Sequence, residues 1–293
     1  MNTKMLNKFE TVNGFIAALD QSGGSTPKTI EKYGLFEWEN EEMMFDIVHD
    51  MRSRIMTSDS FTGDKVLGVI LFEDTINRTV NGIPTAQYLW KEKGIIPFAK
   101  IDKGLEEFKN GCQGLRPITN LNETLLDLKA KGIFGTKMRS VIYNANETGV
   151  TDLVKQQFDI AKEVIAHGLV PIIEPEISID AEFKELAEMV LRVNLEHFLE
   201  QLKPDQKVIL KLTLPEVDNY YASLVGHPNV LKVVALSGGY SQEVALKKLS
   251  ANNGVVASFS RALLCDLRAE QNDHEFNDVL GQAVNQVYDA SNT

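Results

Sequence analysis

Lys211 lies inside an apolar run, and this placement suggests unusual chemistry. The run reads Val-Ile-Leu-Lys-Leu-Thr-Leu over residues 208–214, which is typical of a strand buried on both faces. A buried ammonium group costs free energy unless it is paired or loses its proton. The neutral amine is a nucleophile that forms Schiff bases with carbonyl substrates. Lys211 is therefore either a Schiff-base lysine or a strand-end lysine whose charged tip extends to solvent.

Ionisable residues also stand near the ends of four other apolar runs. They are Asp20, Lys100, Lys137, Arg139, Glu174 and Glu176. Because side chains two residues apart on a strand share a face, Lys137 pairs with Arg139 and Asp20 with Ser22. Glu174 and Glu176 share a face in the same way. Charges at one rim of a parallel barrel predict an active site, and the alternative is a ring of salt bridges that only closes the barrel top.

Two later runs end in residues suited to an anion. The first ends in Ser237-Gly238-Gly239, followed by a helix that Ser241 caps, and the second contains Ser258 and Arg261. Glycines let backbone N–H groups approach an anion, and a helix N-terminus adds positive potential. Arginine binds phosphate with two parallel hydrogen bonds. These residues predict a phosphate site.

The elements that must position these residues alternate between strands and helices. Eight strands are predicted, and they cover residues 15–20, 67–72, 95–101, 134–139, 169–176, 208–214, 231–237 and 255–261. Helices are predicted to open at Ser25, Asn40, Asn122, Thr151 and Ser241. Eight strand–helix units in one chain predict an α/β fold, a (β/α)8 TIM barrel that forms a single domain over residues 1–293.

Composition excludes several other classes of protein. The net charge of −11 and the lack of a basic cluster argue against a nucleic-acid partner. The apolar runs are too short to span a membrane and no signal peptide is evident, which together with only two cysteines, Cys112 and Cys265, favours a cytoplasmic protein. No histidine stands at a predicted strand end, and no Gly-x-Ser-x-Gly is present. Neither a metal nor another cofactor is therefore expected.

In combination, the motifs over roughly residues 11–265 resemble class I fructose-bisphosphate aldolase in its short bacterial form. The motifs are Ala-Leu-Asp20-Gln-Ser, Gly-Val-Ile-Leu-Phe-Glu73, Lys100-Ile-Asp-Lys-Gly, Lys137-x-Arg139, Ile-Glu174-Pro-Glu176, Leu-Lys211, Leu-Ser237-Gly-Gly and Ser258…Arg261. The resemblance implies a metal-independent lyase of glycolysis and gluconeogenesis. Such an enzyme cleaves fructose 1,6-bisphosphate to dihydroxyacetone phosphate and glyceraldehyde 3-phosphate through a lysine Schiff base.

The resemblance also implies a role for each catalytic residue. Lys211 resembles the Schiff-base lysine, and Glu174 the acid/base that serves formation and dehydration of the carbinolamine. Glu176 resembles its hydrogen-bonding partner beside the lysine, and Asp20 the residue that handles the hydroxyl proton during carbon–carbon cleavage. Lys137 resembles the cation held near the nucleophile, where positive neighbours favour a neutral amine.

The remaining implied residues bind the substrate and its phosphates. They are Ser22, Lys100, Arg139, Ser237, Gly238, Gly239, Ser258 and Arg261. Two positions depart from the family pattern, because Gln21 stands where many relatives carry glutamate and Ser260 replaces a glycine before Arg261. The chain also lacks the long tail ending in tyrosine of many animal relatives.

Three alternatives stay open at this point. A tagatose-bisphosphate aldolase or a transaldolase-like enzyme would use the same Schiff-base chemistry. A barrel that binds a ligand without catalysis would not need Lys211 beside two glutamates. The small-molecule partner is expected to be a sugar bisphosphate, and the sequence leaves both a monomer and a homo-oligomer open.

Overall fold

The fold is built on a central sheet of eight parallel strands, and this confirms the predicted barrel. The computed structural model describes residues 2–293, the side chain of Ala262 excepted. The strands, in their order around the barrel, are β1 (Phe15–Leu19), β2 (Val66–Leu71), β5 (Ile96–Lys100), β7 (Gly135–Ile142), β8 (Val170–Ile177), β9 (Val208–Thr213), β10 (Val230–Leu236) and β11 (Val255–Ala257). Because neighbouring strands are parallel, all their carboxyl ends meet at one rim.

The barrel is nearly closed between its first and last strands. No regular ladder joins β1 to β11 among the described residues. Instead, the Ala18 N–H donates to the Phe259 carbonyl, with 3.1 Å between nitrogen and oxygen, just beyond the end of β11. Predicting a strand over residues 255–261 was therefore too long, since the chain leaves the sheet after Ala257 and turns into a helix at Arg261.

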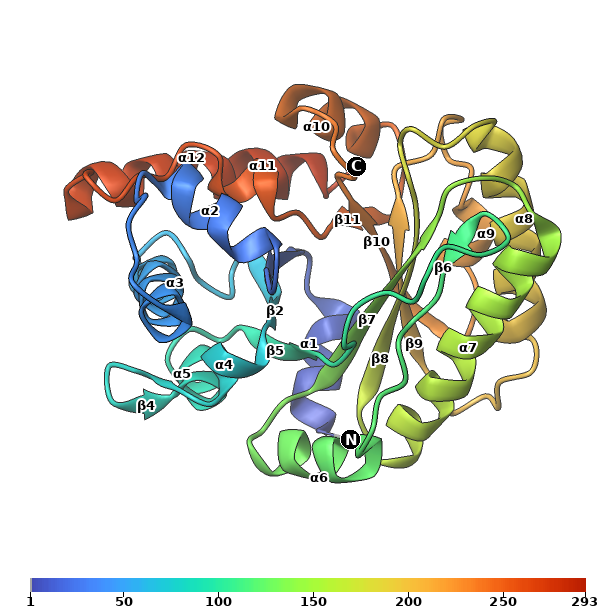
Figure 1. Ribbon diagram of the computed structural model, residues 1–293, viewed down its shortest axis with the longest axis horizontal. Coiled ribbons are helices and arrows are strands. Elements are labelled where there is room, and N and C mark those ends of the chain that lie inside the picture. The colour runs from blue at the N-terminus through green and yellow to red at the C-terminus, as the bar shows by residue number, and fades with distance from the viewer. Residues whose placement is uncertain (1) are drawn as a thin grey trace.

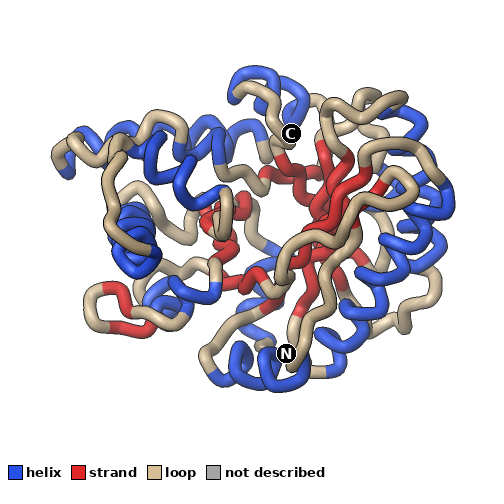
Figure 2. The backbone as a smooth tube through the Cα atoms, in the orientation of Figure 1, coloured by secondary structure: helices blue, strands red, loops and turns tan. Residues whose placement is uncertain are grey.

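Helices surround the sheet and cover its outer face, as Figures 1 and 2 show. They are α1 (Thr3–Thr11), α2 (Ser25–Tyr33), α3 (Glu41–Thr57), α4 (Glu73–Ile76), α5 (Thr85–Lys91), α6 (Leu121–Ala130), α7 (Glu147–Ala166), α8 (Lys184–Leu199), α9 (Ala222–Val225), α10 (Gln242–Ser250), α11 (Arg261–Leu264) and α12 (Asp273–Ala290). Short strands β3 (Thr79–Val80) and β4 (Ile83–Pro84) form a hairpin, and β6 (Cys112–Gln113) pairs antiparallel with β7.

The sequence analysis predicted some helix starts correctly and placed others too late. Asn40 caps α3 and Ser241 caps α10, as expected, because each side chain accepts a hydrogen bond from a backbone N–H in the first turn. Two starts were placed too late: α6 begins after Asn120 rather than at Asn122, and α7 is capped by Asn146 rather than Thr151. In α7, the capping bond from the Gly149 N–H to Asn146 Oδ1 is 2.9 Å long.

Helix α1 closes the amino-terminal end of the barrel, and the sequence analysis did not predict it. Its buried residues Met5 and Phe9 pack on the apolar side chains that fill the barrel interior. The Phe9 ring lies edge-on to Phe98, with 5.8 Å between ring centroids. Lys8 Nζ donates to the carbonyls of Gly63 and Gly94 and so fixes the helix to two loops. This end of the barrel is therefore filled, and the opposite rim carries the polar groups.

No helix within residues 2–293 is both long enough and apolar enough to cross a membrane.

Candidate functional site

A cavity of about 470 Å³ opens at the carboxyl rim of the strands. Every predicted site residue lines it except Gly239. These residues are Asp20, Ser22, Lys100, Lys137, Arg139, Glu174, Glu176, Lys211, Ser237, Gly238, Ser258 and Arg261. They come from seven strands and the loops that follow them, so the barrel itself gathers them.

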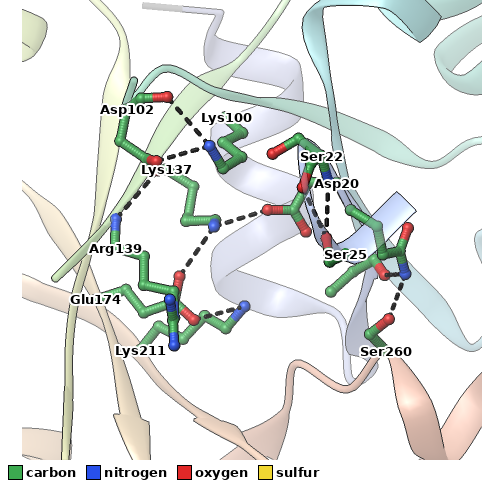
Figure 3. Close-up of polar contacts among 12 residues, drawn as sticks. Asp20, Ser22, Ser25, Lys100, Asp102, Lys137, Arg139, Glu174, Lys211 and Ser260 are labelled. Atoms are coloured by element: carbon green, nitrogen blue, oxygen red, sulfur yellow. Dashed lines mark hydrogen bonds and ion pairs between the residues drawn. The ribbon is translucent and has the colours of Figure 1, made fainter. Parts of the chain in front are cut away.

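Four of these side chains form a continuous chain of ion pairs at the floor of the cavity (Figure 3). The Lys211 ammonium lies 3.0 Å from Glu174 Oε1. The other oxygen of Glu174 lies 3.1 Å from Lys137 Nζ, which in turn lies 2.7 Å from Asp20 Oδ2. Glu174 therefore bridges two lysines and is within proton-transfer distance of Lys211. The alternative of a strand-end lysine pointing into solvent is wrong, because Lys211 is 4% exposed.

The pairing sets the charges of the buried groups. Burial alone would raise the pKa of Asp20, but the positive charges of Lys137 and Lys211 hold it well below its usual value. Burial alone would lower the pKa of Lys137, but the charges of Asp20 and Glu174 outweigh burial and raise it. Asp20 is therefore an anion and Lys137 a cation at neutral pH.

Glu176 pairs with Arg139 rather than with Lys211. The Arg139 Nε–H donates to Glu176 Oε2, and burial, which would lower the pKa of Arg139, is outweighed by this carboxylate, which raises it. The carboxylate in contact with Lys211 is Glu174. The two glutamates share a strand face as predicted, but they bind different cations.

Lys100 is held by a residue that the sequence analysis did not single out. Its Nζ lies 2.6 Å from Asp102 Oδ1. The other oxygen of Asp102 accepts from the Arg139 backbone N–H at 3.2 Å. Asp102 thus ties the end of β5 to β7 and points the Lys100 ammonium along the cavity wall. The position of Asp102, two residues after Lys100, was the signal in the sequence that could have identified it.

The predicted phosphate loop follows β10. Gly238 has φ +60° and Gly239 has φ +127°, and the second value lies where side-chain-bearing residues are strained. Ser241 then caps α10. A methyl group added to Gly239 would lie 3.8 Å from Arg261 Nη1, so this arginine, which follows the neighbouring strand β11, reaches the loop.

Two further observations favour an anion between this loop and α11. Ser258 is 2% exposed, and its hydroxyl has no hydrogen-bond partner in the described part of the chain. No carboxylate among residues 2–293 pairs with the Arg261 guanidinium. A buried unsatisfied hydroxyl is costly unless a ligand completes it. Both groups are thus available to a phosphate.

A buried arginine supports the site from behind, and the sequence analysis did not find it. Arg52 of α3 is fully buried. Its Nη2 donates to the Gln21 carbonyl at 2.7 Å and to Gln21 Oε1 at 3.2 Å. Burial lowers the pKa of Arg52 to about 10, against the opposing charges of Asp20 and Asp74. Arg52 carries no local signal, because it stands between Met51 and Ser53 in the middle of a helix.

No three His, Cys, Asp or Glu side chains within the described residues converge in a way that could hold a metal ion.

The sequence is similar to known proteins over most of its length. The family model for fructose-bisphosphate aldolase class-I matches residues 6–218. A curated protein from Synechocystis sp., fructose-bisphosphate aldolase class 1, is 53% identical over 294 residues, which cover 100% of this chain and 98% of the relative. The latter match also covers Ser237, Gly238, Gly239, Ser258 and Arg261, which lie beyond residue 218.

Solved structures share the fold at lower sequence identity. Fructose-bisphosphate aldolase from Plasmodium falciparum, in a complex with TRAP and a small-molecule inhibitor, has a TM-score of 0.77 and 21% identity over 98% of this chain and 93% of its own. An archaeal fructose-1,6-bisphosphate aldolase, whose catalytic Lys is covalently bound to the carbinolamine intermediate, has a TM-score of 0.52 and 11% identity over 97% of this chain and 99% of its own.

Proposed function

The chain belongs to the class I fructose-bisphosphate aldolase family, and on that premise we propose that Lys211 forms the Schiff base with the substrate. Members of this family are lyases that cleave fructose 1,6-bisphosphate reversibly to dihydroxyacetone phosphate and glyceraldehyde 3-phosphate. The observation that carries the proposal is the Lys211 amine, buried in the cavity with a carboxylate oxygen 3.0 Å away. A lysine that needed only solvation would not be placed there.

In the first half of the reaction, Glu174 moves the protons. It accepts one from the Lys211 ammonium, and the neutral amine attacks C2 of the substrate to form a carbinolamine. Glu174 then returns a proton to the C2 hydroxyl, which leaves as water, and a protonated imine remains. The positive nitrogen now draws electrons from the C3–C4 bond, which is the task a metal ion would otherwise perform.

In the second half, Asp20 takes the proton of the C4 hydroxyl. The C3–C4 bond breaks, its electrons form the enamine, and C4 leaves as the aldehyde of glyceraldehyde 3-phosphate. Protonation of C3 and hydrolysis of the imine then release dihydroxyacetone phosphate and restore Lys211. Lys137 lies between Asp20 and Glu174, so it stabilises both carboxylates as their charges change during the cycle.

The two phosphates of the substrate are assigned to opposite sides of the cavity. Ser237, Gly238, Gly239, Ser258 and Arg261 bind the phosphate of the dihydroxyacetone end. Lys100 of β5 and Arg139 of β7 lie across the barrel from that loop and bind the other end, and Ser22, which follows β1 beside β11, also binds the substrate. Basic side chains on both sides of the cavity, Arg261 on one and Lys100 and Arg139 on the other, favour a bisphosphate over the single phosphate of a transaldolase substrate.

Borohydride trapping tests the Schiff base directly. With fructose 1,6-bisphosphate present, reduction is expected to add one triose phosphate, or the intact sugar, to the peptide that contains Lys211, as mass spectrometry reports. Lys211→Met should abolish both cleavage and the adduct. Lys232→Met is the matched control, because this half-buried lysine stands near the start of β10, outside the cavity. Cleavage by Lys211→Met, or an adduct on another lysine, would overturn the assignment.

Tagatose 1,6-bisphosphate should be compared in the same assay. It carries the same phosphates and differs only in the configuration of a hydroxyl group, so its relative rate measures how strictly the cavity reads stereochemistry. We expect fructose 1,6-bisphosphate to be the better substrate.

Three further expectations stay predictions. One apolar core cluster runs from Phe15 to Ala290, and this favours one domain over residues 1–293. The choice between a monomer and a homo-oligomer is open to sedimentation measurements. The cytoplasmic location expected from the sequence is open to cell fractionation.

A further inference from the structure

Within the described residues, the seam between β1 and β11 is the place where neighbouring barrel strands lack a regular ladder. One backbone hydrogen bond crosses it, from the Ala18 N–H to the Phe259 carbonyl. A second bond joins side chains: the Gln21 Nε2–H donates to Ser260 Oγ. Ser260 is drawn with this dashed contact in Figure 3. The side-chain bond is therefore a substantial part of what holds the two edges together at the rim.

The Gln21 amide has a fixed orientation. Arg52, which is fully buried, donates to both the carbonyl and the side-chain oxygen of Gln21. Since an arginine only donates, the amide oxygen must face it and the amide nitrogen must face away. The nitrogen then meets the Ala18 carbonyl at 3.2 Å and the Ser260 hydroxyl. The buried cation thus aims the amide across the seam.

Gln21 and Ser260 each stand next to a residue of the proposed mechanism in the sequence. Gln21 follows Asp20, and Ser260 precedes Arg261. The Ser260 carbonyl also accepts from the Leu263 and Leu264 N–H groups, at 3.1 Å each, so this residue anchors the first turn of α11. The bond therefore joins the strand end that carries the proton-transfer residue to the turn that carries the phosphate-binding arginine.

Helix α11 has space behind it. A second cavity of about 50 Å³ lies between α2, α3 and α11, and Gln21, Ser260 and Arg261 line it together with apolar side chains such as Met51 and Leu264. The turn at Arg261 is thus not fixed by close packing on that side. A hydrogen bond across the seam has more effect on a turn with room to shift than on one wedged in a core.

We propose that Gln21 and Ser260 form a positioning pair that holds Arg261 in register with Asp20, so that a phosphate bound at α11 places the sugar correctly for proton transfer. The pair rests on the proposed function. Neither residue is assigned contact with the reacting atoms. The structure joins the two residues directly by one hydrogen bond.

A double-mutant cycle tests the pair in the full-length enzyme. Gln21→Met keeps the length of the side chain without the amide, and Ser260→Ala removes only the hydroxyl group. Ser260→Ala is expected to raise KM for fructose 1,6-bisphosphate and the inhibition constant of inorganic phosphate about fivefold, the effect of one ordinary hydrogen bond. Gln21→Met should raise both at least as much, because it also loses the bonds with Arg52 and the Ala18 carbonyl. Because both variants lose the bond across the seam, the double variant should show about the change of Gln21→Met alone rather than the product of the two.

Two controls separate positioning from general loss of stability. Gln113→Met makes the same replacement outside the cavity, where Gln113 accepts from the Tyr143 hydroxyl. Ser250→Ala removes an exposed hydroxyl at the end of α10. Both should leave KM unchanged. Thermal unfolding is measured for every variant, and if Gln21→Met does not fold, Ser260→Ala alone carries the test through its KM and phosphate inhibition.

Unchanged KM in Ser260→Ala, or effects that multiply in the double variant, would overturn the pair. This failure is distinct from failure of the proposed mechanism. The pair is measured by KM and phosphate inhibition in an active enzyme, whereas the Schiff base is measured by the adduct on Lys211.

Discussion

Lys137→Met is expected to destabilise the fold strongly, because Lys137 neutralises two buried carboxylates. Its ammonium lies 2.7 Å from Asp20 and 3.1 Å from Glu174, and its side chain is 3% exposed. Methionine keeps the length of the chain and removes the charge. Removing one partner of a buried ion pair costs about 3–5 kcal/mol, because the other charge is left uncompensated. Glu174 keeps Lys211 as a partner, so Asp20 is the carboxylate that loses most.

The pH dependence of this loss has a defined sign. The pKa of Asp20 in the folded enzyme is held below its unfolded value of 3.8. Its contribution to stability is therefore present above about pH 4 and is lost as the pH falls below that value. In Lys137→Met the missing charge lets the pKa of Asp20 rise, so this contribution shrinks. The difference in stability between the wild type and the variant should be largest near neutral pH and should narrow in acid.

Urea-induced unfolding followed by circular dichroism measures both expectations. Lys103→Met is the matched control, because Lys103 pairs with Glu73 at the surface, where both side chains are at least half exposed. Its loss should cost under about 1 kcal/mol. A cost near that value for Lys137→Met at neutral pH, or a difference that does not change with pH, would refute the reasoning.

Three other perturbations have expected outcomes. Tyr240→Phe removes the 2.8 Å hydrogen bond from the tyrosine hydroxyl to Glu216, beside the phosphate loop. It should raise KM for dihydroxyacetone phosphate in the condensation direction about fivefold with kcat unchanged, and an unchanged KM would show that the loop needs no such anchor. Asp102→Asn frees the Lys100 ammonium and should lower kcat/KM for the bisphosphate about tenfold; steady-state kinetics with full activity would argue against this restraint. Dialysis against EDTA should leave the cleavage rate unchanged, and a strong loss restored by a divalent metal would contradict Schiff-base catalysis.

The strands and the residues at the carboxyl rim could be predicted from the sequence. Each strand is a short apolar run, and a parallel barrel brings all carboxyl ends together whatever the loops do. That single geometric rule was enough to group residues from Asp20 to Arg261. The same rule explains why a contact between Lys211 and a glutamate was expected, and the structure shows that this glutamate is Glu174. Which of the two glutamates would touch the lysine depends on strand register, and the sequence does not show register.

The residues that support the site could not be predicted from the sequence, because their partners are distant in the chain. Gln21 and Ser260 are separated by 239 positions, and either one alone is an ordinary loop residue. Arg52 resembles a surface residue of a helix, and its partners Thr75 and Gln21 are 23 and 31 positions away. Helix α1 has only two buried side chains, Met5 and Phe9, and their partners belong to the barrel interior. Such tertiary contacts override weak local signals.

The filled amino-terminal end of the barrel restricts the route of the reactants. With Phe9 seated beside Phe98 and Phe134, the sugar can enter and the two trioses can leave only through the same mouth. In the proposed mechanism, the aldehyde fragment is free once the carbon–carbon bond breaks, whereas the other triose is still bound covalently to Lys211. The proposal therefore expects the two products to leave one after the other through this mouth.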